Sequence, residues 1–178
     1  EETISKIRGG QIDVLTSIDN QWSPQINLGV SVLIPEAYVE DLDVRLGLYR
    51  RLSNLSKKVE FEGFAAELID RFGKLPPEVN TLLLIVRIKS VCKKAGIGKL
   101  DGGPKGATVQ FHNDKFISPE GLVEFIKRQN GLAKIKDNKL IIKRDWEKKS
   151  DKFKGAFSIA RDLAEIAASY QNSSPTKN

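Results

Sequence analysis

The 178-residue chain is 40% hydrophobic, which supplies enough apolar side chains for a core and excludes a wholly disordered protein. No apolar run reaches about 18 residues and no signal-peptide pattern opens the chain, so we expect no contact with a membrane. Cys92 is the only cysteine, which excludes an intrachain disulfide and predicts a reducing, cytoplasmic location. The chain begins at Glu1 and has no methionine, so we expect a piece of a longer protein.

The net charge of +6 is distributed unevenly along the chain. The first 85 residues carry 9 Lys and Arg against 13 Asp and Glu, whereas residues 86–178 carry 20 against 10. A basic half of this kind can contact the phosphates of a nucleic acid. The more ordinary interpretation is solvated lysines on helix and strand faces, and the composition leaves both interpretations open.

The N-terminal part of the chain is expected to be largely irregular before its first full helix. Residues 1–8 are typical of the last turns of a helix, and residues 11–29 lack periodicity and are interpreted as a linker. Residues 29–35 alternate Val and Ile with other side chains and end at a proline, which predicts a strand. Asp41 or Asp43 is then expected to cap a helix.

Two helical patterns meet at a proline-containing corner in the middle of the chain. Gly73 is expected to end the first helix, and Pro77 is expected to lie in the first turn of the second. The apolar residues of both patterns recur at helical spacing and are expected to form a helix hairpin's buried face. These residues are Phe61, Phe64, Ala65, Leu68, Phe72, Val79, Leu82, Leu83, Ile85, Val86, Ile88 and Cys92.

A charged triplet, Glu67, Asp70 and Arg71, occupies a different face of the first of these helices. One interpretation is a solvated face with a Glu67–Arg71 ion pair that contributes a few tenths of a kcal/mol. A general acid and base pair is disfavoured, because nothing on an outer helix face would shift the two carboxyl pKa values apart. An exposed binding surface explains the triplet more economically than an acid and base pair does.

Strands mixed with helices are expected in the second half of the chain. Residues 97–100 are predicted to be extended, residues 101–106 to turn, and residues 107–111 to form a half-buried strand. Ser118 is expected to open a helix, and residues 133–144 are expected to form a hairpin.

The chain is expected to end in a long helix that Ser150 caps. Its apolar stripe consists of Phe153, Phe157, Ala160, Ala164 and Ala167. The predicted fold class is therefore α+β: a helical N-terminal part containing a helix hairpin, packed with a small, mostly antiparallel sheet and a long C-terminal helix.

No catalytic constellation is convincing in this sequence. His112 is the only histidine, so a zinc site fails on the number of ligands. The glycines from Gly102 to Gly106 lack the spacing of a Walker A phosphate loop and are interpreted as a turn. Cys92 is interpreted as a buried structural thiol. We therefore expect neither an enzyme activity nor a cofactor or metal in this chain.

One block of the sequence resembles a known family. Residues 66–83 (AELIDRFGKLPPEVNTLL) and 96–100 (GIGKL) resemble the C-terminal domain of the bacterial transcription-repair coupling factor, the Mfd family. Upstream, residues 32–35 (VLIP) and 43–46 (DVRL) are similar to the entry into that domain. The resemblance spans roughly residues 30–170.

The resemblance implies a division of the chain into three parts. Residues 1–29 correspond to the end of a preceding motor lobe and its linker, residues 30–172 to the C-terminal regulatory domain, and residues 173–178 to a frayed tail. The implied parent is a double-stranded DNA translocase, driven by ATP and magnesium, that displaces RNA polymerase stalled at lesions. It also recruits UvrA for nucleotide excision repair. The motor itself lies outside this chain.

In this family the C-terminal domain is understood as a non-catalytic clamp that hides the N-terminal UvrA-binding module of the same protein. Glu67, Asp70 and Arg71 stand in the matched motif, so the resemblance implies that they contact that module. Complementary arginines are then expected on the module.

The alternative hypothesis is a nucleic-acid-binding accessory module that uses the basic half of the chain. The expected phosphate contacts are then Lys134, Lys136, Lys139, Lys143 and Arg144.

Overall fold

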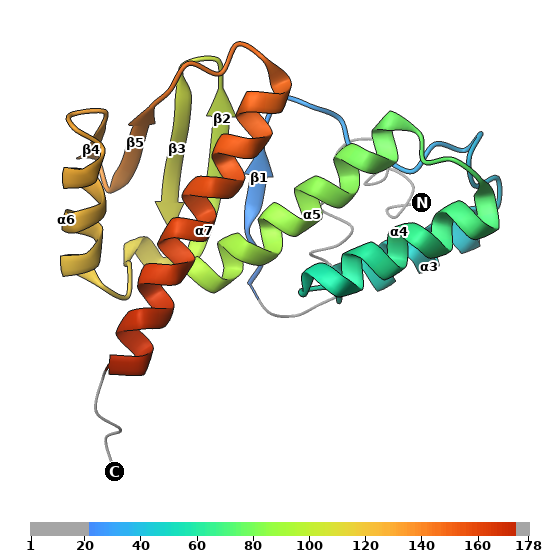
Figure 1. Cartoon of the computed structure of the whole chain (residues 1–178), viewed down its shortest axis with the longest axis horizontal. Coiled ribbons are helices and arrows are strands. Elements are labelled where there is room, and N and C mark those ends of the chain that lie inside the picture. Colours follow the sequence, from blue (N-terminus) through green and yellow to red (C-terminus); the bar gives the residue numbers. More distant parts are fainter. Residues whose placement is uncertain (1–21, 174–178) are drawn as a thin grey trace. The chain divides into compact units, whose positions relative to one another are not determined.

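The computed structural model describes residues 22–173, which form two compact units (Figure 1). The body of the helical unit is Val30–Ser90. The sheet unit consists of Pro24–Gly29 and of the chain from Val91 onward. The helix end predicted at residues 1–8 and most of the predicted tail at residues 173–178 lie outside the described residues.

The helical unit is built from α3 (Leu42–Ser53), α4 (Lys58–Phe72) and α5 (Pro77–Ala95), and α5 continues past the boundary into the sheet unit. Asp41 caps α3, because its carboxylate accepts a hydrogen bond of 3.0 Å from the backbone N–H of Val44. Gly73 ends α4 with a φ of 94°, a value that favours glycine. The predicted cap and both predicted ends of the helix corner are thus confirmed.

The core of the helical unit follows the predicted helical periodicity. Ala65, Phe72 and Leu83, at the margins of the predicted faces, are only half-buried. The fully buried side chains of the three helices in this unit are Leu48, Tyr49, Leu52, Phe61, Phe64, Leu68, Val79, Leu82, Ile85, Val86 and Ile88.

The strand predicted at residues 29–35 is wrong. Val32 and Ile34 are buried, as the alternating pattern requires, but the segment pairs with no other strand in the described part of the chain. The backbone N–H of Ile34 instead donates a hydrogen bond of 2.7 Å to the hydroxyl of Tyr49. The alternation therefore marked burial against helices rather than membership of a sheet.

A second tyrosine fixes the end of α4. The hydroxyl of Tyr38 lies 2.7 Å from the carbonyl oxygen of Gly73 and 3.0 Å from that of Leu68, and donates toward both. Carbonyl groups at a helix C-terminus lack partners within the helix, so this side chain supplies one from the preceding segment. The position of the last turn of α4, which carries Asp70 and Arg71, is thereby set by residues outside the helix.

The sheet unit contains a five-stranded sheet with the order β1-β2-β3-β5-β4. Its strands are β1 (Gln25–Asn27), β2 (Ile97–Gly103), β3 (Gly106–Phe111), β4 (Ala133–Lys136) and β5 (Lys139–Lys143). Only the β1–β2 pairing is parallel among the described strands, so the sheet is mostly antiparallel, as predicted. β1 lies within the segment that the sequence predicts to be a linker, where three residues are too few to show a period.

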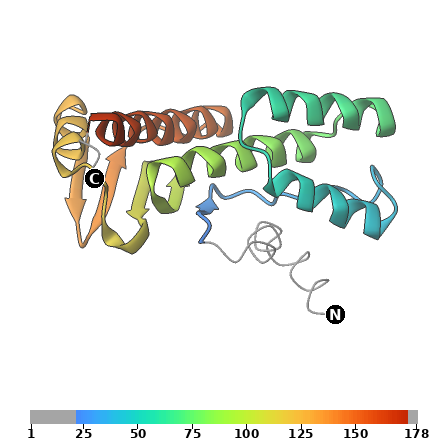
Figure 2. The same cartoon turned by 90° about the horizontal axis from the view of Figure 1, so that it is seen from below.

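Helices α6 (Pro119–Arg128) and α7 (Lys149–Ser173) lie on one side of this sheet (Figure 2). They cover an apolar face in which strand residues alternate between buried and outward-facing positions. The buried side chains of these strands and helices include Leu100, Ala107, Val109, Phe111, Leu140, Ile142, Leu122, Phe125, Phe153, Ala156, Ile159, Ala160, Leu163 and Ala167. The opposite face of the sheet carries the polar side chains.

Two boundaries in the sheet unit differ from the prediction. β2 continues to Gly103, because Gly102 and Gly103 pair with Ala107 and Gly106 of β3. Helix α7 begins at Lys149, so Ser150 lies inside its first turn and does not cap it. The α+β class, the hairpin β4–β5 and the long C-terminal helix are confirmed.

Candidate functional site

The three residues of the predicted interaction triplet lie on α4, as their spacing requires, and a fourth residue joins them. Arg51, in the last turn of α3, donates hydrogen bonds to the carboxylate of Glu67 from its two terminal nitrogens, Nη1 and Nη2, at 2.5 and 2.8 Å. Arg71 approaches the same carboxylate at 3.3 Å. We refer to Arg51, Glu67, Asp70 and Arg71 as the α4 charged face.

Aromatic rings support the two arginines of this face. The guanidinium carbon of Arg51 lies 5.1 Å from the centre of the Phe64 ring, and that of Arg71 lies 4.8 Å from the centre of the Phe72 ring. Both distances are within the range of cation–π attraction. Rings below and a carboxylate beside them therefore restrain both guanidinium groups.

The two arginines change the chemistry of Glu67. The hydrogen bond from Arg51, followed by the charge of Arg51 and the weaker contact with Arg71, lowers the pKa of Glu67 from 4.5 to about 2. A carboxylate of this kind stays ionised near neutral pH and donates no proton, so an acid and base role is disfavoured on this ground also. The sequence did not predict the shift, because Arg51 stands 16 residues before Glu67.

Asp70 differs from Glu67 although both are on α4. Its side chain is exposed, and within residues 22–173 it takes part in no hydrogen bond or ion pair. Towards the start of the helix, its neighbours one turn away are Glu67, which is half-buried, and Ala66, which is exposed. The carboxylate of Asp70 is therefore accessible to another protein element.

The second predicted set of residues, the five basic side chains of the β4–β5 region, is divided by the structure. Lys134 and Lys136 of β4 and Lys139 and Lys143 of β5 occupy the polar face of the sheet. Arg144 is half-buried, and its guanidinium group donates hydrogen bonds to the side-chain oxygen of Gln129 and to the carbonyl of Lys143. Arg144 thus joins the end of α6 to β5 instead of extending the lysine set.

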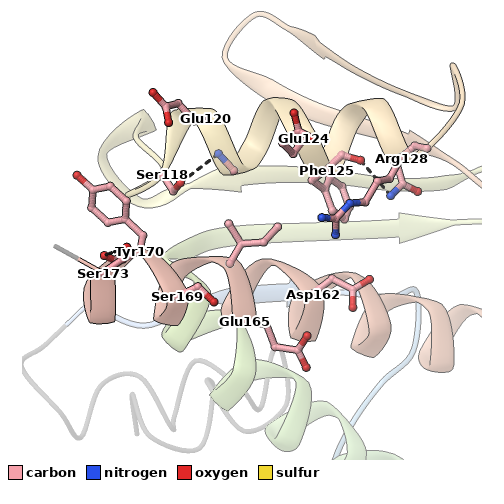
Figure 3. Close-up of a pocket in the computed structure, with 13 residues that line it drawn as sticks. Ser118, Glu120, Glu124, Phe125, Arg128, Asp162, Glu165, Ser169, Tyr170 and Ser173 are labelled. Carbon is pink, nitrogen blue, oxygen red and sulfur yellow. Dashed lines mark hydrogen bonds between the residues drawn. The ribbon is translucent and has the colours of Figure 1, made fainter.

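A groove of about 720 Å³ between α6 and α7 is a feature that sequence analysis did not predict (Figure 3). Carboxylates line it from both helices: Glu120 and Glu124 from α6, and Asp162 and Glu165 from α7. Arg128 is the one basic residue among its described lining residues. The spacing of the acidic residues within each helix could have indicated their shared faces, but the meeting of the two helices could not be read from it.

Cys92, the one cysteine of the sequence, has a structural role in this fold. Cys92 is fully buried, and burial raises the pKa of its thiol to about 12, so it is not a nucleophile near neutral pH. In the described residues, no group of three or more His, Cys, Asp or Glu side chains could hold a metal ion. None of the described helices is long and apolar enough to cross a membrane.

A family model and several known proteins are similar to this chain. A family model described as the TRCF domain matches residues 28–122, a range that contains α3, α4 and α5. The chain is 48% identical over 124 residues to the transcription-repair-coupling factor of Rickettsia conorii and 31% identical over 129 residues to that of Escherichia coli. These alignments cover 69% and 72% of the chain but only 11% of each relative, so the chain spans about a tenth of their length.

A solved structure shares the fold. It is described as the crystal structure of the C-terminal domain of transcription-repair coupling factor, and it superposes with a TM-score of 0.69 at 21% sequence identity. The superposition covers 85% of this chain and 98% of that one.

Proposed function

Because the chain belongs to the TRCF domain family, we propose that it is the C-terminal autoinhibitory domain of a transcription-repair coupling factor. The parent protein would be an ATP-dependent DNA translocase that displaces RNA polymerase stalled at lesions in the bacterial cytoplasm and recruits UvrA. ATP and its magnesium ion would bind to the motor of that parent, and the chain itself would take no catalytic step. Its role would be to bind the UvrA-binding module of the same protein and so to mask it.

The observation that carries this proposal is the α4 charged face. Its central carboxylate, that of Glu67, is held by two arginines, which leaves the face ordered and close to neutral in total charge. An ordered surface loses little side-chain entropy on binding, which lowers the cost of forming the contact. A covalent tether in the parent raises the effective concentration of the module, so a weak contact is sufficient for masking.

The same geometry predicts unequal roles for the two acidic residues. The charge of Glu67 is already largely balanced by Arg51 and Arg71, so a cation on the module gains little from approaching it. Asp70 has no such partner in the described residues, and its side chain is exposed. We therefore assign to Asp70 the main ionic contact with an arginine or lysine of the module, and to Glu67 the ordering of its neighbours.

The test uses the full-length parent protein and measures the dissociation constant for fluorescently labelled UvrA. Asp70→Ala should unmask the module and tighten UvrA binding by on the order of tenfold, within the usual range of coupling between sites. Glu67→Ala should have a smaller effect. Glu36→Ala changes the charge equally at another exposed position of the helical unit and serves as the matched control.

Equal UvrA affinity in the Asp70→Ala, Glu36→Ala and unaltered proteins would contradict the proposed masking role. A larger effect for Glu67→Ala than for Asp70→Ala would retain the masking role but overturn the division of labour between the two carboxylates.

A further inference from the structure

The strand register assembles a one-sided array of lysines that no part of the proposed autoinhibitory role uses. Lys136 pairs with Lys139, and Lys134 pairs with Ile141, so these residues share a face of the β4–β5 hairpin. Lys143 lies two residues beyond Ile141 on the same strand and therefore points to the same side. Leu140 and Ile142, which alternate with them, are buried on the helix side of the sheet.

This face continues across β3 and β2. Ile141 pairs with Thr108, and Thr108 pairs with Asp101, which places both on the side that carries the lysines. Lys99 lies on that side as well, opposite Gln110. We refer to the outward side chains of these strands as the outer sheet face: Lys99, Asp101, Thr108, Gln110, Lys134, Lys136, Lys139, Ile141 and Lys143.

The charge of the outer sheet face is nearly all positive and is not neutralised within the described part of the protein. Asp101 is the one acidic side chain among its strand residues, and it pairs with Lys99 at 3.8 Å. The lysines at positions 134, 136, 139 and 143 are exposed and form no ion pair with any described residue. Adjacent strands are about 4.8 Å apart, so the four like charges lie near one another and repel. Binding of a polyanion would relieve this repulsion.

The composition of the face also indicates how a polyanion would bind. The outer sheet face contains no aromatic side chain, so it offers no platform on which an unpaired base could stack. Lysines act as flexible point charges and lack the rigid planar fork of arginine. From the register, the unpaired lysines and the absence of rings on this face, we infer that the outer sheet face binds the phosphate backbone of a nucleic-acid duplex, independently of sequence.

The size of the expected effect follows from the number of phosphates that the face can neutralise. With four lysines engaged, the logarithm of the binding constant should fall with the logarithm of salt concentration with a slope of about −3.6. Raising the salt from about 50 to 200 mM should then weaken binding by roughly 100-fold. Binding should be weak at physiological salt, as is usual for contacts with phosphates alone.

The experiment titrates the 178-residue chain into short labelled DNA and RNA duplexes and follows fluorescence anisotropy at several salt concentrations. Replacing the lysines at 134, 136, 139 and 143 by glutamine should weaken duplex binding at low salt by at least tenfold and reduce the slope towards zero. Replacing the same four by arginine should preserve both. The matched control exchanges four exposed lysines on other surfaces for glutamine: Lys74, Lys94, Lys115 and Lys154.

The control variant has the same net charge as the first variant. A difference in duplex binding between them therefore reports the position of the lysines and not the net charge. Thermal unfolding of each variant checks folding, and if the fourfold exchange lowers stability, two double exchanges, one in each strand, should each remove about half of the slope. Binding to either duplex supports backbone recognition, and the ratio of the two affinities shows whether DNA or RNA is preferred.

Three results would overturn the inference. One is equal duplex binding by the array variant and the control variant. Another is tighter binding to a single strand of the same length, which would require a stacking platform elsewhere. The third is tighter binding to an acidic peptide, such as polyglutamate of equal charge, which would make the partner a protein. None of these results depends on whether Asp70 contacts the UvrA-binding module.

Discussion

The α4 charged face and the outer sheet face each centre on four charged side chains, but they arrange them in opposite ways. On α4 two arginines and two acids are combined, and one carboxylate already satisfies both arginines. On the β4–β5 hairpin four lysines stand together, and none of them pairs with an acidic group in the described chain. A mixed, ordered surface selects a partner by the positions of its charges, whereas a surface of one sign attracts any polyanion.

The family match adds to this contrast. It covers residues 28–122 and thus includes the α4 charged face, while the lysines of the β4–β5 hairpin lie beyond it. The proposed masking role therefore rests on the part of the chain that the family model matches, and the proposed duplex contact rests on the geometry of this chain.

The largest expected effect comes from the backbone that supports the lysine array. Gly106 has a φ of 130°, and a β-carbon there would collide with the carbonyl oxygen of Ile142 in β5. Gly106→Ala should therefore destabilise the protein by about 2–4 kcal/mol and lower Tm by roughly 5–15 °C. Thermal unfolding followed by circular dichroism measures this change.

Gly63→Ala provides the matched comparison on α4. Position 63 is helical, and no heavy atom lies within 4 Å of an added β-carbon, so the substitution should stabilise the protein by about 0.4–1 kcal/mol. If Gly106→Ala stabilised the protein as Gly63→Ala should, the close approach in the sheet would have been misjudged.

The next effect concerns the segment that the sequence predicts to be a strand. Tyr49→Phe removes the buried hydroxyl that accepts the hydrogen bond from the N–H of Ile34, which should cost about 1–3 kcal/mol. Tyr38→Phe removes hydroxyl contacts nearer the surface and should cost less, because water can replace them. Urea denaturation of both variants measures the difference, and equal costs would contradict the assignment of Tyr49 as the buried anchor.

These tyrosines also show where prediction from sequence succeeds and where it ends. Periodicity and capping signals are local, so Asp41, Gly73 and Pro77 were sufficient to place α3, α4 and α5 correctly. The partners of Tyr49 and Tyr38 lie 15 to 35 residues away, and no local pattern encodes such contacts. The error at residues 29–35 has the same origin, since a period of two reports burial on one side and not what covers that side.

The site was predicted to a similar extent. Spacing placed Glu67, Asp70 and Arg71 on one helix, as the structure confirms, whereas the shared face of the four lysines is known only from the strand register. Spacing could not show that Arg51 reaches Glu67 from another helix, or that Gln129 holds Arg144. The decisive feature of each surface, paired charges on one and unpaired charges on the other, depends on tertiary contacts.

A smaller effect should come from removing the arginine that balances Glu67. Arg51→Gln leaves Glu67 with Arg71 alone, so its carboxylate becomes more available to a cation on the UvrA-binding module. In the full-length parent, masking should become stronger and UvrA binding weaker, by roughly two- to fivefold. The sign is opposite to that expected for Asp70→Ala, and tighter UvrA binding would contradict the expectation that the freed charge of Glu67 strengthens masking.

The smallest effect is a dependence of stability on pH. Since the pKa of Glu67 is lowered to about 2 from its usual 4.5, its ion pair with Arg51 contributes stability above about pH 4.5 and loses it as pH falls towards 2. The side chains are 36% and 49% exposed, so solvent limits the contribution to below about 1 kcal/mol. Urea denaturation should show the unaltered protein and Arg51→Gln converging in stability as pH falls, and a constant difference would contradict this.

Displacement of UvrA by the isolated chain tests the central claim most directly. The 178-residue chain is titrated into a preformed complex of UvrA with the separate UvrA-binding module, and release of labelled UvrA is measured. The unaltered chain should displace UvrA in a saturable manner, and the Asp70→Arg chain should require at least a tenfold higher concentration. Failure of the unaltered chain to displace UvrA at any concentration, or equal displacement by the Asp70→Arg chain, would contradict masking through the α4 charged face.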